Sequence, residues 1–201
     1  MTGERKTVEE VLAEVVKDSI FYDESGGGVT FSGGEPLMQP RYLRALLEAC
    51  RARGIQTAVD TCGYAPLRNL LDAVPLTELF LYDLKFMDEA LHLDYTGVSN
   101  ASILSNLEEL GKIHRNIWLR IPIIPGLNDA EDQLDAMARF AASIPGVRQV
   151  NLLPYHRTGV QKFSRLGEEY RLAHVVPPTT ERMEAALARF SAAGLKAKSG
   201  G

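Results

Sequence analysis

The chain has 201 residues, of which 45% are hydrophobic and 24% charged, and its formal net charge is −4. This composition is typical of a globular protein, and we expect a single domain over residues 1–201. The charges are well mixed, the apolar runs are far shorter than the roughly 20 residues of a membrane helix, and the first residues are charged. We therefore expect no nucleic-acid binding, no membrane insertion and no signal peptide, and we expect a cytoplasmic location.

Helix and strand patterns alternate along the chain. Thr7, followed three residues later by Glu10, forms a capping-box pattern that predicts the start of a first helix. Amphipathic spacing predicts further helical segments at residues 40–53, 67–73, 87–115 and 130–143, and a last one from Thr179 and Thr180 to Gly194. Runs of β-branched and aromatic residues predict strands at residues 29–31, 57–60, 79–83, 117–123 and 149–153.

Repeated strand-helix units imply right-handed crossovers and a parallel sheet. The sequence therefore predicts an α/β fold, either a barrel or an open doubly wound sheet. The connection from Tyr155 to Pro178 is long, and connections of this length are commonly functional. We expect it to form a lid over the substrate.

Polar residues follow each predicted strand. Because the carboxyl ends of parallel strands meet on one face, we expect these residues to share one site. The convergence indicates an enzyme or a ligand-binding face without identifying the ligand. The polar segments are Ser32 to Pro36, Asp60 with Thr61, Asp83 to Lys85, Arg120 with Pro122, and Leu153 to His156.

The chemistry of two of these segments suits a zwitterion. Gly33 and Gly34 allow a sharp turn whose carbonyl groups are free to accept hydrogen bonds from an ammonium group, and no phosphate-loop pattern follows them. Asp83 and Lys85 alternate with Leu84, so both side chains point to the same side. An amino acid would place its ammonium near Asp83 or Glu35 and its carboxylate near Lys85, whereas the structural alternative is an internal salt bridge.

Four further residues are candidates for either a structural role or a ligand contact. Asp60, placed beside Asp83 on a neighbouring strand, could cap a helix or contribute to a small cation site. His156 follows a strand, which favours a ligand contact. The two cysteines, Cys50 and Cys62, match neither a disulfide framework nor a metal spacing; Cys50 has the pattern of a core residue, and the role of Cys62 stays open.

Several longer motifs resemble the glycyl-radical-enzyme activating enzymes, the pyruvate formate-lyase activase type of radical S-adenosylmethionine (SAM) protein. They occur in the family order across nearly the whole chain. They are GGGVTFSGGEP at 26–36, VDTCGY at 59–64, YDLKFM at 82–87, YTGVSN at 95–100, IWLRIP at 117–122, LLPYH at 152–156 and GEEY at 167–170.

The resemblance implies a fold and a set of binding residues. The fold would be a partial TIM-type (β/α)6 radical SAM barrel that lacks its first strand-helix unit. The resemblance assigns no catalytic side chain. It places SAM against Gly33, Gly34 and Glu35 at its amino group, against Asp83, Leu84 and Lys85 at its amino-acid end, and against His156, with Arg120 near SAM or the incoming peptide. A monovalent cation would be held by Asp60 and Asp83, with backbone oxygens near Thr61 and Leu81.

The resemblance also implies a reaction. SAM is cleaved reductively at a [4Fe-4S] cluster, with an electron from a flavodoxin or a ferredoxin-type donor, and the 5′-deoxyadenosyl radical takes hydrogen from a backbone glycine of a partner glycyl radical enzyme. The family's C-x3-C-x2-C segment does not occur in this sequence, and Cys50 and Cys62 lie on separate elements. We therefore expect this chain alone to be inactive, and its Val29 strand to be an unpaired edge that limits stability or promotes self-association.

Two alternatives remain. A Schiff-base lyase or aldolase would use Lys85 at a strand end, where a desolvated lysine attacks a carbonyl. A fragment that binds SAM, or docks on a glycyl radical enzyme, without chemistry would share the same binding residues. Trapping with borohydride tests the first alternative. Loss of SAM binding in Asp83→Ala or Lys85→Ala fits both the activating enzyme and the non-catalytic fragment, and only cluster reconstitution and a glycyl-radical signal distinguish these two.

Overall fold

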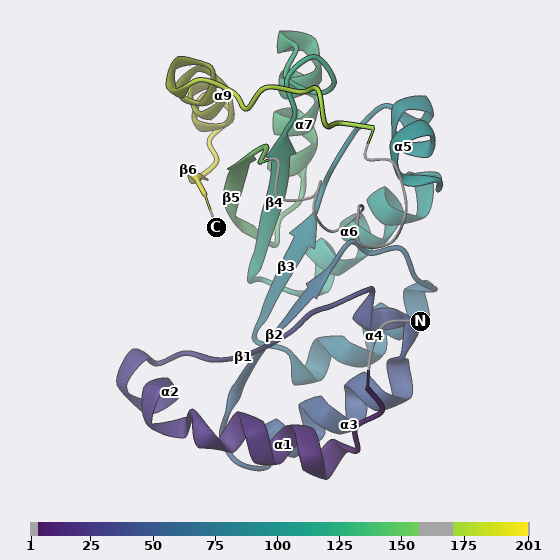
Figure 1. Ribbon diagram of the computed structural model, residues 1–201, viewed down its shortest axis with the longest axis vertical. Helices are drawn as coiled ribbons and strands as arrows, with labels where there is room; N and C mark the ends of the chain where they lie inside the picture. The colour runs from purple at the N-terminus through teal and green to yellow at the C-terminus, as the bar shows by residue number, and fades with distance from the viewer. Residues whose placement is uncertain (1–3, 157–170, 201) are drawn as a thin grey trace. The chain divides into compact units, whose positions relative to one another are not determined.

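The computed structural model describes residues 4–156 and 171–200 as an α/β fold (Figure 1). Within these ranges one six-stranded sheet has the strand order β1-β2-β3-β4-β5-β6. The pairs β1–β2, β2–β3 and β5–β6 are parallel, which confirms the predicted fold class. The strands are β1 (Gly28–Phe31), β2 (Gln56–Thr61), β3 (Leu79–Asp83), β4 (Ile117–Ile123), β5 (Val147–Pro154) and β6 (Ala197–Ser199).

The last strand, β6, was not among the predicted ones. Its sequence, Ala-Lys-Ser, lacks β-branched and aromatic residues, so it has no local strand signal. It forms because β5 supplies hydrogen-bond partners: the Val150 N–H donates to the Lys196 carbonyl and the Gly200 N–H donates to the Leu152 carbonyl, both at 2.9 Å. At the other end of the order, β1 pairs with β2, and the predicted self-association through its outer edge stays a prediction.

The chain divides into two compact units, each assembled from two stretches of sequence. The first unit contains Met1–Asp83 and Ala101–Ile117, and the second contains Leu84–Asn100 and Trp118–Gly201. The expectation of a single domain stays a prediction.

Helices of the first unit pack beside β1, β2 and β3. They are α1 (Val8–Lys17), α2 (Ser19–Ser25), α3 (Pro40–Arg51), α4 (Leu67–Ala73) and α6 (Ala101–Ile113), with short 3-10 turns η1 (Pro36–Met38) and η2 (Val74–Leu76).

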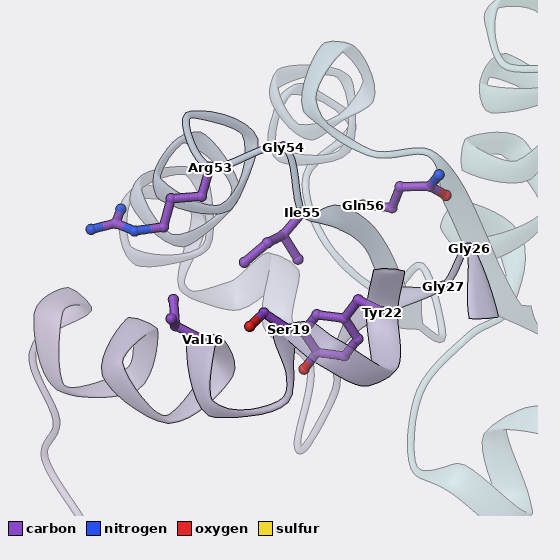
Figure 2. A pocket seen from close by; sticks show the side chains of 9 residues that line it. All are labelled: Val16, Ser19, Tyr22, Gly26, Gly27, Arg53, Gly54, Ile55 and Gln56. Atoms are coloured by element: carbon purple, nitrogen blue, oxygen red, sulfur yellow. The ribbon is translucent and has the colours of Figure 1, made fainter. Parts of the chain in front are cut away.

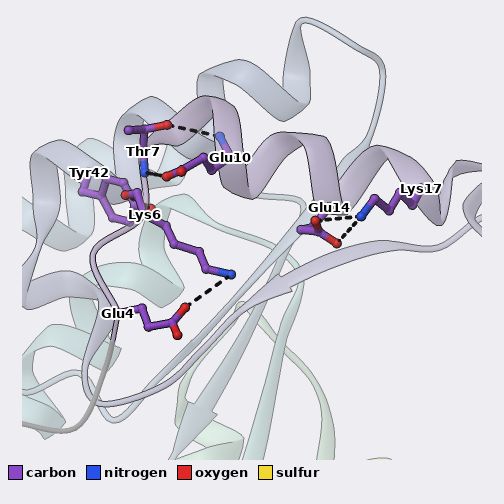
Figure 3. A network of polar contacts seen from close by, with 7 residues as sticks. All are labelled: Glu4, Lys6, Thr7, Glu10, Glu14, Lys17 and Tyr42. Carbon is purple, nitrogen blue, oxygen red and sulfur yellow. Dashed lines mark hydrogen bonds and ion pairs between the residues drawn. The ribbon is translucent and has the colours of Figure 1, made fainter.

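The predicted capping box of α1 is present: the Glu10 N–H donates to Thr7 Oγ1 at 3.2 Å and the Thr7 N–H donates to Glu10 Oε2 at 2.7 Å (Figure 3). The Tyr42 hydroxyl donates to the Lys6 carbonyl at 2.9 Å, which attaches the segment before α1 to α3. Helix α2 was not predicted, because its apolar residues Ile20 and Phe21 are exposed and do not form a buried stripe.

The second unit contains α5 (Glu89–Thr96), α7 (Glu131–Ser143) and α9 (Thr180–Ala192). The helical segment expected at residues 87–115 is two helices, α5 and α6, because Gly97 adopts φ +79° and ends α5. Phe86, Ile124, Tyr155 and Val175 form a buried cluster in this unit. Among the described residues, every helix is too short or too polar to cross a lipid bilayer.

Candidate functional site

Alternation along β2 and β3 separates two kinds of side chain. Thr61 and Tyr82 are buried, whereas Asp60, Leu81 and Asp83 are half-buried. Successive side chains of a strand point to opposite faces, so the two carboxylates lie on the less buried face and the two hydroxyl groups lie on the covered face. The first unit therefore presents acidic groups where a ligand has access.

The turn after β1 has the backbone shape that its glycines suggest. Gly33 has φ +90° and Gly34 has φ +59°, and a Cβ atom added to either glycine would meet no atom within 4 Å. The backbone of this turn is consequently open to a ligand. Just before it, the Ser32 hydroxyl donates to Asp60 Oδ2 at 2.8 Å, which connects the end of β1 to the half-buried face of β2.

The Glu35 carboxylate points back into the first unit. Its Oε1 accepts from the Leu37 N–H at 3.1 Å and from the Thr61 hydroxyl at 2.7 Å. Its Oε2 accepts from the Cys62 N–H at 2.9 Å and from the Cys62 thiol at 3.0 Å. These donors tie the turn to the end of β2, a link between residues 26 and 27 positions apart that the sequence did not reveal.

A buried network supports Thr61 from behind. Thr61 Oγ1 accepts from the Gly63 N–H at 2.8 Å, and Gly63, at φ +73°, lies so close to Tyr82 that an added Cβ would be 1.7 Å from its hydroxyl oxygen. The Tyr82 hydroxyl donates to the Ile103 carbonyl at 2.7 Å, and Asn106 Nδ2 donates to the Gly63 carbonyl at 2.9 Å. Burial raises the pKa of Tyr82 well above its ordinary value, so the hydroxyl stays a donor.

The residues predicted to hold a cation are partly together. Asp60 is the register partner of Leu81, and Thr61 is the partner of Tyr82, so Asp83 lies two positions farther along β3. Within the described part of the chain there is no group of three or more His, Cys, Asp or Glu side chains arranged to hold a metal ion. The cation assignment stays a prediction.

The remaining predicted residues belong to the second unit. The Leu84 N–H donates to the Arg120 carbonyl at 3.0 Å, which places these two backbones side by side. Lys85 and Arg120 are half-buried. His156 is exposed and follows Tyr155, whose N–H donates to the Ile123 carbonyl at 3.1 Å. Gly33, Gly34, Asp60 and Asp83 belong to the first unit.

Asn128 is a buried residue that the sequence analysis did not identify. Its side chain donates to the Lys85 carbonyl at 2.9 Å and to the Pro122 carbonyl at 2.7 Å, and it accepts from the Ile124 N–H at 2.8 Å. Asn128 therefore fixes the backbone beneath Lys85. The available signal was an amide-bearing residue just after Pro125 and Gly126, a pattern that reads equally well as an ordinary turn.

The long connection after β5 lies partly outside the described residues. The GEEY motif at 167–170 falls there, and the predicted lid stays a prediction. Where the description resumes, Arg171 forms an ion pair with Asp94 at 2.9 Å, and its guanidinium carbon lies 4.6 Å from the centroid of the Tyr95 ring. The Tyr155 hydroxyl donates to the Leu172 carbonyl at 2.8 Å. These contacts attach the segment that follows the connection to the rest of the second unit.

A separate pocket of about 460 Å³ lies at the opposite ends of β1 and β2, where these strands begin (Figure 2). Ser19 and Tyr22 line it from α2, and Gly26, Gly27 and Gln56 line it beside the strand starts. It is therefore distinct from the turn at Gly33 and Gly34, which follows β1.

The two cysteines have different surroundings. Cys50 is fully buried in α3, as predicted, and burial raises the pKa of its thiol. Cys62 lies after β2, with its thiol against Glu35. Two thiols on separate elements do not provide the ligands of an iron-sulfur cluster.

Comparison with known proteins identifies the family. Residues 2–141 match the profile of the Radical SAM superfamily. The chain belongs to this superfamily. It is 41% identical over 196 residues to the choline trimethylamine-lyase activating enzyme of Oleidesulfovibrio alaskensis, covering 94% of this chain and 63% of that protein. It is 38% identical over 186 residues to the pyruvate formate-lyase 1-activating enzyme of Escherichia coli, covering 90% of this chain and 75% of that protein.

A solved structure agrees with this assignment. A domain of the pyruvate-formate lyase-activating enzyme from Bacteroides vulgatus superposes with a TM-score of 0.75 and 35% identity, covering 87% of this chain and 99% of that one. The resemblance to activating enzymes of glycyl radical enzymes and the radical SAM fold class are thus confirmed. The chain spans slightly less than two thirds of the length of the choline trimethylamine-lyase activating enzyme.

The superfamily uses SAM and a [4Fe-4S] cluster, and these two groups fit the residues of this chain differently. The turn at Gly33 and Gly34, which follows Ser32 and its hydrogen bond to Asp60, has an open backbone that fits the amino-acid end of SAM. The environments of Cys50 and Cys62 do not suit a cluster.

Proposed function

We propose that this chain is the SAM-binding core of an activating enzyme that generates a glycyl radical on a partner enzyme through a 5′-deoxyadenosyl radical. The observation that carries the proposal is the open Gly33-Gly34 turn at the end of β1, in a chain that is 41% identical to an activating enzyme. The lyase alternative that uses Lys85 is not favoured, because the similar proteins named above are activating enzymes.

The binding residues are proposed as follows. The turn formed by Gly33, Gly34 and Glu35 accepts hydrogen bonds from the SAM ammonium group, since its glycines leave backbone carbonyls accessible. Asp83 and Lys85 supply opposite charges for the amino-acid end, with Leu84 between them. Arg120 and His156 are proposed to contact the remainder of SAM.

Isothermal titration with SAM tests this assignment. We expect the chain to bind SAM, and Asp83→Ala and Lys85→Ala each to weaken binding at least about tenfold, because each removes a charge-assisted hydrogen bond. Asp132→Ala and Lys198→Ala, which remove the same charges from other parts of the chain, should leave the dissociation constant unchanged. An unchanged dissociation constant in both site variants, or no binding by the parent chain, would overturn the assignment.

The partner and the electron donor of the complete enzyme are further parts of the proposal. The partner is a glycyl radical enzyme, and the donor is a flavodoxin or a ferredoxin-type protein. Because Cys50 and Cys62 do not suit a cluster, the 201-residue chain should bind SAM and yet produce no glycyl-radical signal in electron paramagnetic resonance with a partner enzyme and reductant. A radical signal from the chain alone would contradict this expectation.

A monovalent cation is proposed near Asp60 and Asp83, with backbone oxygens of Thr61 and Leu81 completing its ligands. The support is the register that pairs Asp60 with Leu81 and the half-buried position of both carboxylates. SAM affinity should be higher in potassium than in tetramethylammonium chloride, and Asp60→Asn should reduce this difference. Equal affinity in the two salts would exclude the cation.

A further inference from the structure

Lys85 lies in a connection whose backbone is held by side chains. Residues 84–88 join β3 to α5 and belong to neither a strand nor a helix. Backbone carbonyls in such a segment need other hydrogen-bond partners where water does not reach them. The three consecutive carbonyls of residues 85–87 have such partners in the buried side chains of Asn128 and Asn100.

Asn128 joins Lys85 to the end of β4. Its Nδ2 donates to the Lys85 carbonyl at 2.9 Å and to the Pro122 carbonyl at 2.7 Å, and its Oδ1 accepts from the Ile124 N–H at 2.8 Å. The whole residue is 0% exposed, so water does not compete for these bonds. The backbone of Lys85 is therefore fixed relative to β4.

Asn100 holds the two carbonyls that follow. Its Nδ2 donates to the Phe86 carbonyl at 3.0 Å and to the Met87 carbonyl at 2.9 Å. The Phe86 side chain is buried as well, and its ring stacks on the Tyr95 ring with the two centroids 5.9 Å apart. The chain that follows Lys85 is thus anchored through both its backbone and its side chains.

A lysine benefits from this support when it binds an anion. The ammonium group of Lys85 is carried on a flexible four-carbon stem, and that stem loses freedom when the group binds a carboxylate. Fixing the backbone beforehand reduces the freedom that remains to be lost and restricts the positions that the ammonium group can reach. Lys85 is half-buried, so its side chain is accessible while the carbonyls around it are bonded to buried amides.

We propose that Asn100 and Asn128 are positioning residues that hold the backbone at Lys85 and directly after it, so that the lysine ammonium group is directed to the carboxylate of SAM. This inference rests on the proposed function, because Lys85 is the proposed partner of that carboxylate. Neither asparagine contacts SAM; each acts through the backbone that carries Lys85. A purely structural role would lower stability without a selective loss of carboxylate recognition.

The test compares the binding of SAM with that of decarboxylated SAM, which keeps the sulfonium and the ammonium group and lacks only the carboxylate. Asn128→Ala and Asn100→Ala should each weaken SAM binding at least about fivefold in isothermal titration, and should change the affinity for decarboxylated SAM by less than about twofold. In the Lys85→Ala background, either asparagine substitution should have little further effect on SAM, because the group that it positions is absent.

A core variant of the same unit controls for lost stability. Met183 is 6% exposed on α9, and Met183→Ala leaves a cavity that lowers the melting temperature without touching residues 84–88. Titrations of all variants are made well below their melting temperatures. Met183→Ala should bind both ligands as the parent chain does.

Cleavage by trypsin after Lys85 provides a measurement that does not depend on SAM. The bond between Lys85 and Phe86 should be cut slowly in the parent chain, because its carbonyl is bonded to Asn128 and Phe86 is buried. The cleavage should be at least about fivefold faster in Asn128→Ala and Asn100→Ala than in Met183→Ala, because local opening exposes the bond.

Several results would overturn the inference while the proposed function stands. They are parent-like SAM binding by both asparagine variants, equal weakening for SAM and decarboxylated SAM, a full additional effect in the Lys85→Ala background, or a loss of SAM affinity in Met183→Ala as large as theirs. If the parent chain binds no SAM, the proposed function fails and the positioning role fails with it. The rate of cleavage after Lys85 then still shows whether the two amides hold this backbone.

Discussion

Replacing Asn128 by Ala should destabilise the second unit more than an ordinary polar deletion. Asn128 is fully buried, and its side chain donates to the carbonyls of Lys85 and Pro122 and accepts from the Ile124 N–H. Alanine would leave all three backbone groups without this partner. A buried backbone group without a partner loses the hydrogen bond and keeps the cost of removal from water.

The expected magnitude follows from the number of bonds. A typical intramolecular hydrogen bond contributes about 1 kcal/mol net, so losing three should lower the free energy of unfolding by about 3 kcal/mol. For a chain of this length, 1 kcal/mol shifts the melting temperature by about 2–4 °C, which predicts a decrease of about 6–12 °C.

Urea denaturation followed by circular dichroism measures the loss, and hydrogen exchange at the Ile124 amide locates it. Asn116→Ala is a suitable control, because it removes the same side chain where a more exposed Asn116 Nδ2 donates to the Glu78 carbonyl at 2.8 Å. The control should cost about 1 kcal/mol or less. Asn128 does not hold these three backbone groups if Asn128→Ala costs no more than the control or if the Ile124 amide keeps its protection.

Three further predictions concern other parts of the chain. Gly63→Ala should cost about 3 kcal/mol in chemical denaturation, because a Cβ at φ +73° would lie 1.7 Å from the Tyr82 hydroxyl oxygen. Arg171→Ala should lower the free energy of unfolding only above the acidic pH range. The Arg171 hydrogen bond lowers the pKa of Asp94, so the pair stabilises the fold above the ordinary pKa of about 3.9. This stabilisation is lost as the pH falls through the lower folded-state pKa. Burial lowers the pKa of His114 in the folded state, which NMR titration of the ring measures. Acidification from about pH 6.5 downward should therefore protonate the ring in the unfolded state first and reduce the free energy of unfolding.

A specific experimental result would contradict each of these predictions. Gly97→Ala, at φ +79° with no atom within 4 Å of the added Cβ, should cost only about 1–2 kcal/mol, and an equal cost for Gly63→Ala would contradict the steric argument. The Asp94 pair is exposed, so its effect should shrink in high salt, and salt independence would contradict an ion pair. A His114 pKa at or above its ordinary value would contradict desolvation as the dominant effect.

Local sequence patterns predicted the helices and strands that are specified by their own residues. The alternating apolar residues of Leu79–Asp83 and Ile117–Ile123 gave the bounds of β3 and β4 correctly, and the Thr7 capping box marked the start of α1. The pattern failed for β6, whose pairing comes from β5 and is not encoded in Ala-Lys-Ser. The helical period also continued through Gly97, where backbone conformation ends α5.

The sequence predicted which polar residues follow the strands, but it did not predict the hydrogen bonds between distant residues. Parallel topology indicated which polar residues follow the strands, and the glycine turn has the open backbone that the sequence suggested. The partners of Glu35 lie 26 and 27 positions away, and Asn128 lies 43 positions from Lys85. A single sequence does not specify such pairs, because each depends on how strands and turns are placed by packing.

The pattern of burial explains why carboxylates occupy one face of β2 and β3 and hydrogen-bonded hydroxyl groups occupy the other. Burying a carboxylate is expensive, whereas burying a hydroxyl costs little once it has hydrogen-bond partners. Asp60 and Asp83 therefore occupy half-buried positions, and Thr61 and Tyr82 occupy buried ones with their hydroxyl groups bonded to Glu35 and to the Ile103 carbonyl. Because the Thr61 hydroxyl donates to the carboxylate of Glu35, the residue that follows Gly34, we expect a change at this hydroxyl to alter the Gly33-Gly34 turn. The covered face should then influence the shape of the turn even though its side chains are buried.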